Sequence, residues 1–442
     1  MPGPFSGSVP SGKVTAGVLP LSLSDAIDLG LKYNLGLILG DQATRSAEAA
    51  KLRARSALLP DLSAGVSEQG QQLNFKALGF PGSIPGLPGF PVIVGPFNVL
   101  DTRAFLSQQV LNLSAIRNNR AAAENLKASR LSYADSRDVV VLAVTSLYLR
   151  SIAGAARIET TQARVDTAQA LHDQAVDRKK AGVSPGIEVI QSEVELQAEQ
   201  QRLIFYTNEF EKEKLNLARA IGLPLEQKFR LSDQIPYTPP PPLTYEQALE
   251  QAYRSRPDYQ NALALLRAAE HTRQAATAER LPTVSFDANY GAIGPSPADS
   301  HGTFTVAGTA RVSLFDGGRI RSDVEQADAL VQQRKSESED LRSRIDYEVR
   351  TVFLDLKASA DQVNVARSAV DLANQQLTQS RDRFAAGVTN SVEVVQSQET
   401  LATANENYIS SLYSYNLAKA SLARAIGVAE KNARQFLGVS HD

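Results

Sequence analysis

Cysteine is absent from the 442 residues of the chain. Its absence excludes disulfides, thiolate metal sites, a cysteine nucleophile and an amino-terminal lipidated cysteine in this sequence. Long apolar runs are also missing, since no stretch approaches the roughly 20 apolar residues that a membrane-spanning helix needs. If the chain crosses a membrane, we therefore expect it to do so as a β-barrel.

An excess of charge of either sign is missing too. Lysine and arginine total 46 against 48 aspartate and glutamate, a formal net charge of -2, so nothing favours a nucleic-acid partner. The opening Met1-Pro2-Gly3-Pro4-Phe5 lacks the basic and then apolar regions of a signal peptide. Either the protein is cytosolic or its signal peptide has been removed.

Residue clusters that could carry out chemistry are not found in the sequence. His172, His271, His301 and His441 are scattered without the spacing of metal ligands, and His172 falls on a heptad seam, where a packed or solvent-edge histidine is expected rather than a ligand. The glycine-rich loop at 79–96 lacks the Lys-Ser/Thr ending of a phosphate-binding loop. We expect no enzyme activity, no cofactor and no metal site.

An internal repeat organises what is present. Segment 181–192 recurs 205 residues later as 386–397, and the helix ending Leu-Ala-Arg-Ala-Ile-Gly recurs at the same offset. Earlier in each half the offset is 222, so the first copy carries about 17 extra residues, which the Gly- and Pro-rich stretch 79–96 accommodates. A run of four prolines, 239–242, predicts a stiff linker between the halves.

Each half predicts one long helix and a shorter returning helix. The run from Arg319 to Ala386 contains no Gly or Pro, and at about 1.5 Å per residue it allows a helix of roughly 100 Å. Apolar residues recur every seven positions at Val394, Leu401 and Tyr408, which indicates helices packed side by side. An ordinary soluble coiled coil explains these helices equally well.

The segments between the helices favour a membrane protein. Val284, Phe286, Ala288 and Tyr290 alternate with polar residues, as in a strand with one apolar face. Each predicted strand has about the length that crosses a bilayer at a tilt. Four strands cannot close a barrel, so the barrel must be shared among chains. A small soluble sheet that caps a helical bundle is the alternative interpretation.

The predicted order of segments follows from the repeat and from these patterns. An amino-terminal extension (1–20) comes before the first repeat (21–222), which has a helix, strands at about 61–73 and 98–113, a long helix 114–181, a tip 181–187 and a returning helix 187–222. A linker and equatorial segment (223–243) follows. The second repeat (244–427) has a helix, strands at about 283–291 and 302–315, a long helix 319–386, a tip 386–391 and a returning helix 392–427, and a carboxyl-terminal equatorial segment (428–442) ends the chain as given.

At this point the chain resembles the TolC-like outer-membrane efflux protein family over nearly all of its length. The resemblance is carried by Leu58-Leu59-Pro60 and Arg280-Leu281-Pro282 before strands, by Leu314-Phe315-Asp316-Gly317-Gly318-Arg319 from strand to helix, and by the hairpin tips Lys180-Ala181-Gly182-Val183 and Phe384-Ala385-Ala386-Gly387-Val388. Each motif alone is weak, but all of them in order, twice, at two consistent offsets, are specific.

The resemblance implies a mainly α fold with β structure: a homotrimer with a long antiparallel helical coiled-coil tunnel in the periplasm and a 12-stranded β-barrel in the outer membrane, in contact with its lipid. It implies a passive exit duct of a tripartite efflux or type I secretion system, with a periplasmic adaptor (membrane fusion) protein and an inner-membrane transporter as partners. Drugs, metal ions and proteins remain alternative cargoes, because the transporter selects them. A soluble or periplasmic coiled-coil scaffold is the rival function.

The family also implies an aperture at the narrow end of the tunnel. In well-studied members two acidic residues three apart line it. The matching positions here are Glu393 and Gln396, with Glu188 and Gln191 in the first repeat, so one acid of each pair is an amide. A solvated helix face is the alternative interpretation of both glutamates.

A closing lock in such members uses a Tyr before the tip and an Arg after it. Phe384 and Thr389 hold those positions here, so closure is expected to rest on apolar packing and on main-chain hydrogen bonds. The adaptor is expected to dock on the two tips, where glycine supplies the left-handed turn that a hairpin needs. The tip residues are Gly182, Val183, Ser184, Gly387, Val388 and Thr389.

Overall fold

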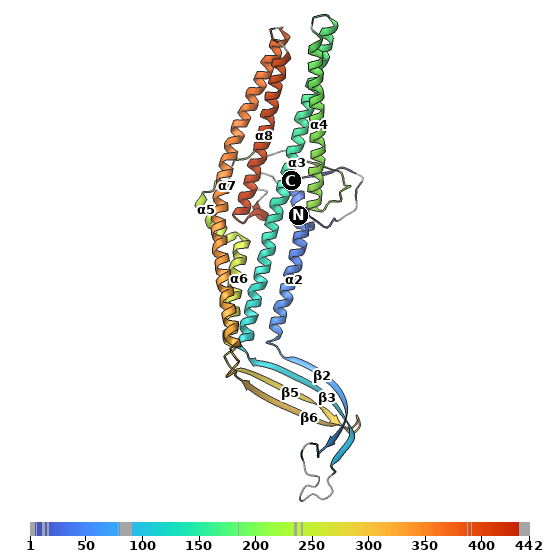
Figure 1. Cartoon of the computed structure of the whole chain (residues 1–442), viewed down its shortest axis with the longest axis vertical. Coiled ribbons are helices and arrows are strands. Elements are labelled where there is room, and N and C mark those ends of the chain that lie inside the picture. The colour runs from blue at the N-terminus through green and yellow to red at the C-terminus, as the bar shows by residue number, and fades with distance from the viewer. Residues whose placement is uncertain are drawn as a thin grey trace. The chain divides into compact units, whose positions relative to one another are not determined.

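The structure is a computed structural model of the whole chain, and Figure 1 shows its elements. It describes residues 5, 7–10, 14–15, 17–77, 79, 91–183, 185–233, 237–239, 242–386, 388–389 and 391–432, with the side chain of residue 391 excepted. The chain divides into two compact units. We call them the hairpin unit (1–44, 128–262 and 337–442) and the sheet unit (45–127 and 263–336). Each unit draws on both sequence repeats, because the long helices pass through both units.

The sheet unit contains four antiparallel strands, which lie side by side in Figure 1. Their order is β2-β3-β5-β6, so the central pair joins the two repeats and β2 and β6 form the edges. The strands are β2 (Asp61–Asn74), β3 (Ile93–Leu111), β5 (Thr283–Gly294) and β6 (His301–Arg311).

The strands differ in extent from the sequence expectation, most of all at the start of β3 and the end of β6, and β5 runs three residues past its expected end to Gly294. β3 begins at Ile93, five residues before the expected start at 98. β6 ends at Arg311, before the expected end at 315, because the chain turns after it. Gly317 and Gly318 adopt φ of 66° and 91°, a left-handed conformation that glycine tolerates best, and helix α7 follows directly.

The two faces of the sheet have different chemistry. Residues directly opposite one another in a ladder point to the same face, so Tyr290 and Phe304 lie together on one side, 71% and 72% exposed. The same register places Ser107 opposite Asp287 on the other face, where the Ser107 hydroxyl donates to the carboxylate at 2.8 Å. The apolar face also carries Leu62, Val66, Leu106, Phe286 and Val306, and the polar face carries Asp101, Arg103, Ser285, Asn289 and Thr305.

The hairpin unit is built around two helical hairpins, α3 with α4 and α7 with α8, which are distinct in Figure 1. Shorter helices α1 and α5 begin with complete capping boxes, Ser22 with Asp25 and Thr244 with Gln247, which fix where each starts. The helices are α1 (Leu23–Tyr33), α2 (Leu35–Ser56), α3 (Leu113–Lys180), α4 (Gly186–Ile221), α5 (Tyr245–Ser255), α6 (Pro257–Ala278), α7 (Arg319–Ala385) and α8 (Ser391–Ala425), and a parallel pair of short strands joins β1 (Leu19–Leu21) to β4 (Phe229–Leu231).

Two apolar clusters stabilise this unit, one for each repeat. The first packs α1 against α3 and α4 around Tyr148, whose hydroxyl donates to the main-chain oxygen of Leu21 at 2.8 Å. The second packs α5 against α7 and α8 around Tyr415, whose hydroxyl donates to the main-chain oxygen of Thr238 at 2.7 Å. Both tyrosines are fully buried, so the predicted linker and equatorial segment is held on the helices through residues such as Thr238.

One stretch of α3 corrects the expectation about apolar runs. By length and composition it could cross a membrane. The stretch is not an uninterrupted apolar run, but it is apolar on average and contains at most two charged residues. Because 56% of it is buried inside the structure, it also has the character of a core helix.

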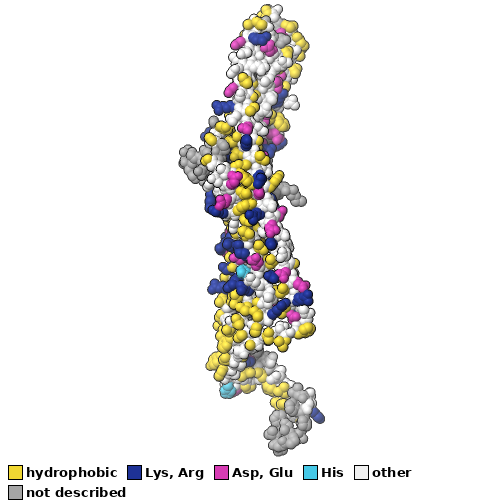
Figure 2. All heavy atoms as spheres, turned by 90° about the vertical axis from the view of Figure 1, so that its left-hand side faces the viewer, with side chains coloured by type: hydrophobic (Ala, Val, Ile, Leu, Met, Phe, Trp, Pro, Cys, Tyr) yellow, Lys and Arg dark blue, Asp and Glu magenta, His cyan; other side chains and the backbone are white. Residues whose placement is uncertain are grey.

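Figure 2 shows acidic and basic side chains interspersed along the helices on one face.

Candidate functional site at the hairpin ends

The first hairpin turns at a glycine in the left-handed conformation. Gly182 has φ of 75°, and its N–H donates to the carbonyl of Lys179 at 3.0 Å. The Val183 N–H donates to the Arg178 carbonyl at 3.0 Å, which completes the usual helix ending with glycine. The side chain of Val183 is 67% exposed. This end therefore presents an apolar side chain on a fixed turn.

The second hairpin ends in a similar way where it is described. The N–H of Val388 donates to the carbonyl of Arg383 at 2.9 Å, the same pattern as in the first hairpin, and its side chain is 70% exposed. Two of the predicted tip residues, Ser184 and Gly387, lie outside the described residues.

Glu393, one of the two predicted aperture acids, is engaged within its own hairpin. The hydroxyl of Thr389 donates to its carboxylate, and the Arg383 guanidinium lies 3.6 Å from the same group. Glu393 is half-buried. Thr389, which lacks the charge of the family's arginine, thus binds the acid that the sequence analysis placed in the aperture, and a basic residue on α7 partly offsets its charge.

Phe384 links the two hairpins through a contact that the sequence analysis missed. The guanidinium of Arg178, at the end of α3, lies over the Phe384 ring at 4.9 Å from its centroid. Such a contact contributes about 0.5 to 1 kcal/mol at an exposed site. Apolar packing was expected at Phe384, and a cation–π contact is found there as well. No spacing rule predicts it, because the two residues come from different repeats.

A cavity near the hairpin ends brings four predicted aperture residues together. It has a volume of about 220 Å³ and lies between α3, α4, α7 and α8. Glu188, Gln191, Phe384 and Gln396 line it, whereas Glu393 and Thr389 do not. We call this cavity the hairpin groove. Its remaining lining residues are Ala168, Leu171, Ala175, Ser192, Val194, Glu195, Val392, Val394 and Val395.

A second contact between the hairpins is made by a charged cluster, which we call the clasp: Arg164 on α3, Glu199 and Arg202 on α4, and Glu399 on α8. Arg202 lies 2.6 Å from Glu199 and 2.8 Å from Glu399, and Arg164 pairs with both glutamates. The Glu199 side chain is only 2% exposed, and this burial raises its pKa although both arginines act to lower it. Its second carboxylate oxygen has no hydrogen-bond partner.

The clasp was not predicted from the sequence. The Glu199 and Arg202 spacing of three residues is visible there, but such pairs are common on solvated helices. Glu195, Glu199 and Glu399 also place carboxylate oxygens within 4.8 Å of one another, and the two arginines already balance much of that charge.

His172, expected to be packed or at the solvent edge, is half-buried and pairs through Nδ1 with the Ser192 hydroxyl at 3.2 Å.

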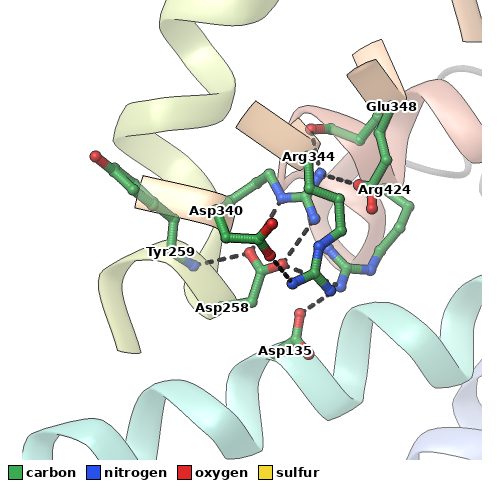
Figure 3. Close-up of polar contacts among 9 residues, drawn as sticks. Asp135, Asp258, Tyr259, Asp340, Arg344, Glu348 and Arg424 are labelled. Carbon is green, nitrogen blue, oxygen red and sulfur yellow. Dashed lines mark hydrogen bonds and ion pairs between the residues drawn. The ribbon is translucent and has the colours of Figure 1, made fainter. Parts of the chain in front are cut away.

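A larger charge network lies farther along the hairpin unit, and Figure 3 shows its acidic and basic groups converging. Arg256, whose side chain is 3% exposed, pairs with Asp258 at 2.7 Å and with Glu348. Arg424 on α8 pairs with Asp135 on α3. Burial raises the pKa of Asp135, whereas Arg256 outweighs the opposing effect of burial and lowers the pKa of Asp258. This network connects α3, α6, α7 and α8.

Comparison with known proteins agrees with this geometry. A sequence profile of the outer membrane efflux protein family matches residues 248–428. Two relatives are pyoverdine export outer membrane proteins OpmQ, from Pseudomonas putida (24% identical over 316 residues, 70% of this chain and 66% of the relative) and Pseudomonas aeruginosa (23% over 330 residues, 72% and 67%). The chain thus spans about two thirds of the length of these relatives.

Similar solved structures cover nearly the whole chain. VceC from Vibrio cholerae superposes with a TM-score of 0.77 at 16% identity, covering 92% of this chain and 96% of that one. The Campylobacter jejuni CmeC channel gives 0.77 at 16% identity, with 99% and 96% covered. The open MtrE channel of Neisseria gonorrhoeae gives 0.78 at 15% identity, with 93% and 90% covered.

The fold, with a four-stranded sheet and two long helical hairpins, is that of an outer-membrane channel. Residues 248–428 thus match the outer membrane efflux protein family, and the fold of the chain is that of the solved channels, in agreement with the resemblance seen in the sequence. The relatives and the solved structures named above are outer-membrane proteins.

Proposed function

We propose that three copies of this chain form a passive duct through the outer membrane, the exit of a tripartite efflux or type I secretion system. The observation that carries the proposal is the sheet. Among the described residues its edge strands β2 and β6 each have no neighbour on their outer side, and most of the residues of the sheet are exposed. Unpaired edges are unfavourable in lipid, and three four-stranded sheets joined edge to edge would satisfy them in a closed 12-stranded barrel.

The two faces of the sheet support this barrel. An outer-membrane barrel needs an apolar exterior and a polar interior along every strand. Tyr290 and Phe304 would face lipid, and Ser107 and Asp287 would face the lumen.

The strand-to-helix junction fits the edge of a membrane. Leu314 and Phe315, which follow β6, are each 92% exposed in the chain. Apolar and aromatic side chains of this kind are favourable at a lipid boundary but not in water. In Figure 2 hydrophobic side chains gather where the helices of the sheet unit join the strands.

The hairpin ends are assigned to the partners. We infer that a periplasmic adaptor docks on the tips at Gly182, Val183, Ser184, Gly387, Val388 and Thr389, and that an inner-membrane transporter supplies the cargo. The exposed Val183 and Val388 support a contact surface there, because each is an apolar side chain on a constrained turn. Both relatives are named for pyoverdine export, which supports an export role for this chain.

The aperture is assigned to Glu188, Gln191, Glu393 and Gln396, with Phe384 and Thr389 in place of the family's lock. Three chains would bring six carboxylates near one constriction, which favours cations over anions. The contacts of Glu393 with Arg383 and Thr389 reduce its share of that field. Cation block is therefore expected to be weak.

The decisive experiment is the native mass of the protein after mild detergent extraction. A duct requires detergent and has the mass of a trimer in light scattering, whereas the rival coiled-coil scaffold is recovered in the soluble fraction. A monomer in detergent would contradict the shared barrel. Co-purification of a transporter and an adaptor would then identify the cargo class.

A further inference from the structure

The hairpin groove has walls that suit an apolar group. Apolar side chains from four helices line it, so the lining is largely aliphatic and aromatic: Leu171 on α3, Val194 on α4, Phe384 on α7, and Val392, Val394 and Val395 on α8. Val394 is fully buried, whereas Val392 is exposed, so the groove reaches from the packed interior toward solvent. Its volume of about 220 Å³ fits a molecule with one ring.

Two carboxylates give the groove its charge. Glu188 and Glu195 both lie on α4, and their spacing of seven residues places them on the same helix face. Both side chains are half-buried, which strengthens their field. Among the described residues that line the groove there is no Lys, Arg or His. The nearby Arg178 is directed to the Phe384 ring, and Arg202 of the clasp interacts electrostatically with Glu195, so both arginines offset part of this negative charge.

We propose that the hairpin groove is a binding site for a small organic cation with one ring and one quaternary or protonated amine. The ring would contact Phe384 and the valines, and the amine would lie near Glu188 and Glu195. A bound cation would contact both hairpins at once and so stabilise their present arrangement. The site is a property of the purified channel, so it can be tested whether or not the duct proposal holds.

The probe is benzyltrimethylammonium, and its binding can be followed at a single introduced thiol. The chain has no cysteine, so Ser192→Cys places the only thiol in the groove lining. We expect the probe to slow modification of this thiol by a methanethiosulfonate reagent, with half-maximal protection on the order of 1 mM for so small a ligand. The neutral N,N-dimethylbenzamide, of similar size, should protect at least about tenfold less well.

Charge variants separate the groove from general surface charge. Adding Glu188→Gln and Glu195→Gln together should weaken protection by the probe at least about tenfold, since both carboxylates are removed. Glu193→Gln is the matched control, because Glu193 lies on the same helix, is exposed and does not line the groove. It should change protection less than twofold. A thiol at Gln201, exposed and away from the groove, should not be protected at all.

Three results would overturn the proposal. One is equal protection by the amide and the cation. Another is a loss of protection with Glu193→Gln as large as with the double variant. The third is a thiol at position 192 that reacts with no reagent although the Gln201→Cys thiol does, since the groove would then be covered in the assembled protein. Each of these results leaves the mass of the particle, and hence the duct proposal, unaffected.

Discussion

The ends of the two hairpins share a sequence pattern 205 residues apart, yet their charged side chains are engaged differently. Arg178 and Arg383 are counterparts in that alignment. Arg383 lies 3.6 Å from Glu393 of its own hairpin, whereas Arg178 lies over Phe384 of the other hairpin. One copy of the arginine therefore stabilises a turn, and the other connects two hairpins. The repeat conserves the helices and lets their contacts diverge.

The clasp makes the same point farther along the helices. Glu199 on α4 corresponds to Ala404 on α8 at the offset of 205 residues, and Glu399 corresponds to Val194. The two glutamates of the clasp therefore have no acidic counterpart in the other repeat. In the proposed trimer each hairpin would need two kinds of helix neighbour, one within the chain and one in the next chain. Divergence of this kind distinguishes them.

The largest effect is expected where the two hairpin ends are most alike. Replacing Gly182 and Gly387 by valine should abolish export while the proposed trimers remain in the membrane. A β-branched residue strains the left-handed turn at Gly182, and the sequence predicts the same turn at Gly387. Space around Gly182 is open, so the strain is in the backbone alone. Export of a fluorescent substrate and the amount of membrane trimer are the two measurements.

The control for this experiment is Gly17→Val. Gly17 is also exposed with open space around it, but its φ is not in the left-handed region. Normal export with Gly17→Val and loss with the tip variants would assign the effect to the turns. Normal export by the tip variants would refute the docking role.

The clasp offers the next largest effect and tests the divergence directly. Glu199→Ala gives α4 the residue that α8 has at the same place. Two arginines then share one remaining glutamate, and removing one partner of a buried ion pair costs roughly 3 kcal/mol. We expect a clear fall in the thermal midpoint of the purified protein.

Glu209→Ala is the matched comparison for the clasp. Glu209 pairs with Lys212 at 2.7 Å on the same helix, but both side chains are well exposed. A pair of this kind contributes about 0.5 kcal/mol. Equal shifts in midpoint for the two variants would show that the clasp is an ordinary surface contact.

The sequence predicted the long helices and the strands because their signals are local and repeated. The run 319–386, which has no Gly or Pro, forms one helix of 67 residues, α7 (Arg319–Ala385), and the alternation in 283–291 lies within β5. The contacts between hairpins were not predictable in the same way. Arg178 meets Phe384, and Arg164 meets Glu399, across more than 200 residues, and no period in the sequence connects them.

The candidate aperture was predicted only in part for a related reason. The sequence predicts equivalent places in the aperture for Glu188 and Glu393, since they occupy the same position in each repeat. In the structure Glu188 lines the hairpin groove, and Glu393 contacts Arg383 and Thr389. Their orientation toward a shared lumen stays a prediction, because it depends on neighbouring chains.

Channel recordings sharpen the comparison of these two glutamates. Arg383→Gln should raise the preference for cations, since it removes the positive charge beside Glu393. The double variant Glu188→Gln, Glu393→Gln should lower both cation preference and block by multivalent cations. We expect changes of about twofold to fivefold in the permeability ratio, measured as reversal potentials in planar bilayers at low salt. If neither substitution changes selectivity, both glutamates belong to a solvated helix face.

The smallest effect is expected in the pH dependence of stability, at two lysines that are also counterparts at the offset of 205 residues. They are Lys214 and Lys419. Each lies 5.4 Å from the ring centroid of an aromatic residue four positions earlier, Phe210 and Tyr415. Lys214 pairs with Glu211 at 3.2 Å. Lys419 is instead fully buried, and its ammonium group donates to the main-chain oxygen of Thr238 at 3.4 Å.

Burial lowers the pKa of Lys419 from 10.5 to about 8, because the charged form loses its hydration. The folded state thus prefers the neutral amine. Above the unfolded pKa near 10.5 this site carries no charge penalty. The penalty grows as the pH falls below 10.5 and is complete below the folded pKa near 8. The protein should therefore gain stability between about pH 8 and pH 10, by at most about 1.4 kcal/mol per pKa unit.

Lys419→Met should remove that gain and raise the thermal midpoint at pH 7, because methionine fills the buried site without a charge. Lys214→Met is the matched control, since it changes the counterpart lysine and should leave the difference between the midpoints at pH 8 and pH 10 as in the parent. Thermal midpoints of the detergent-purified protein at both pH values are the measurement. If the parent and Lys419→Met respond equally to pH, Lys419 is solvated in the folded protein, and the two repeats do not differ at this position.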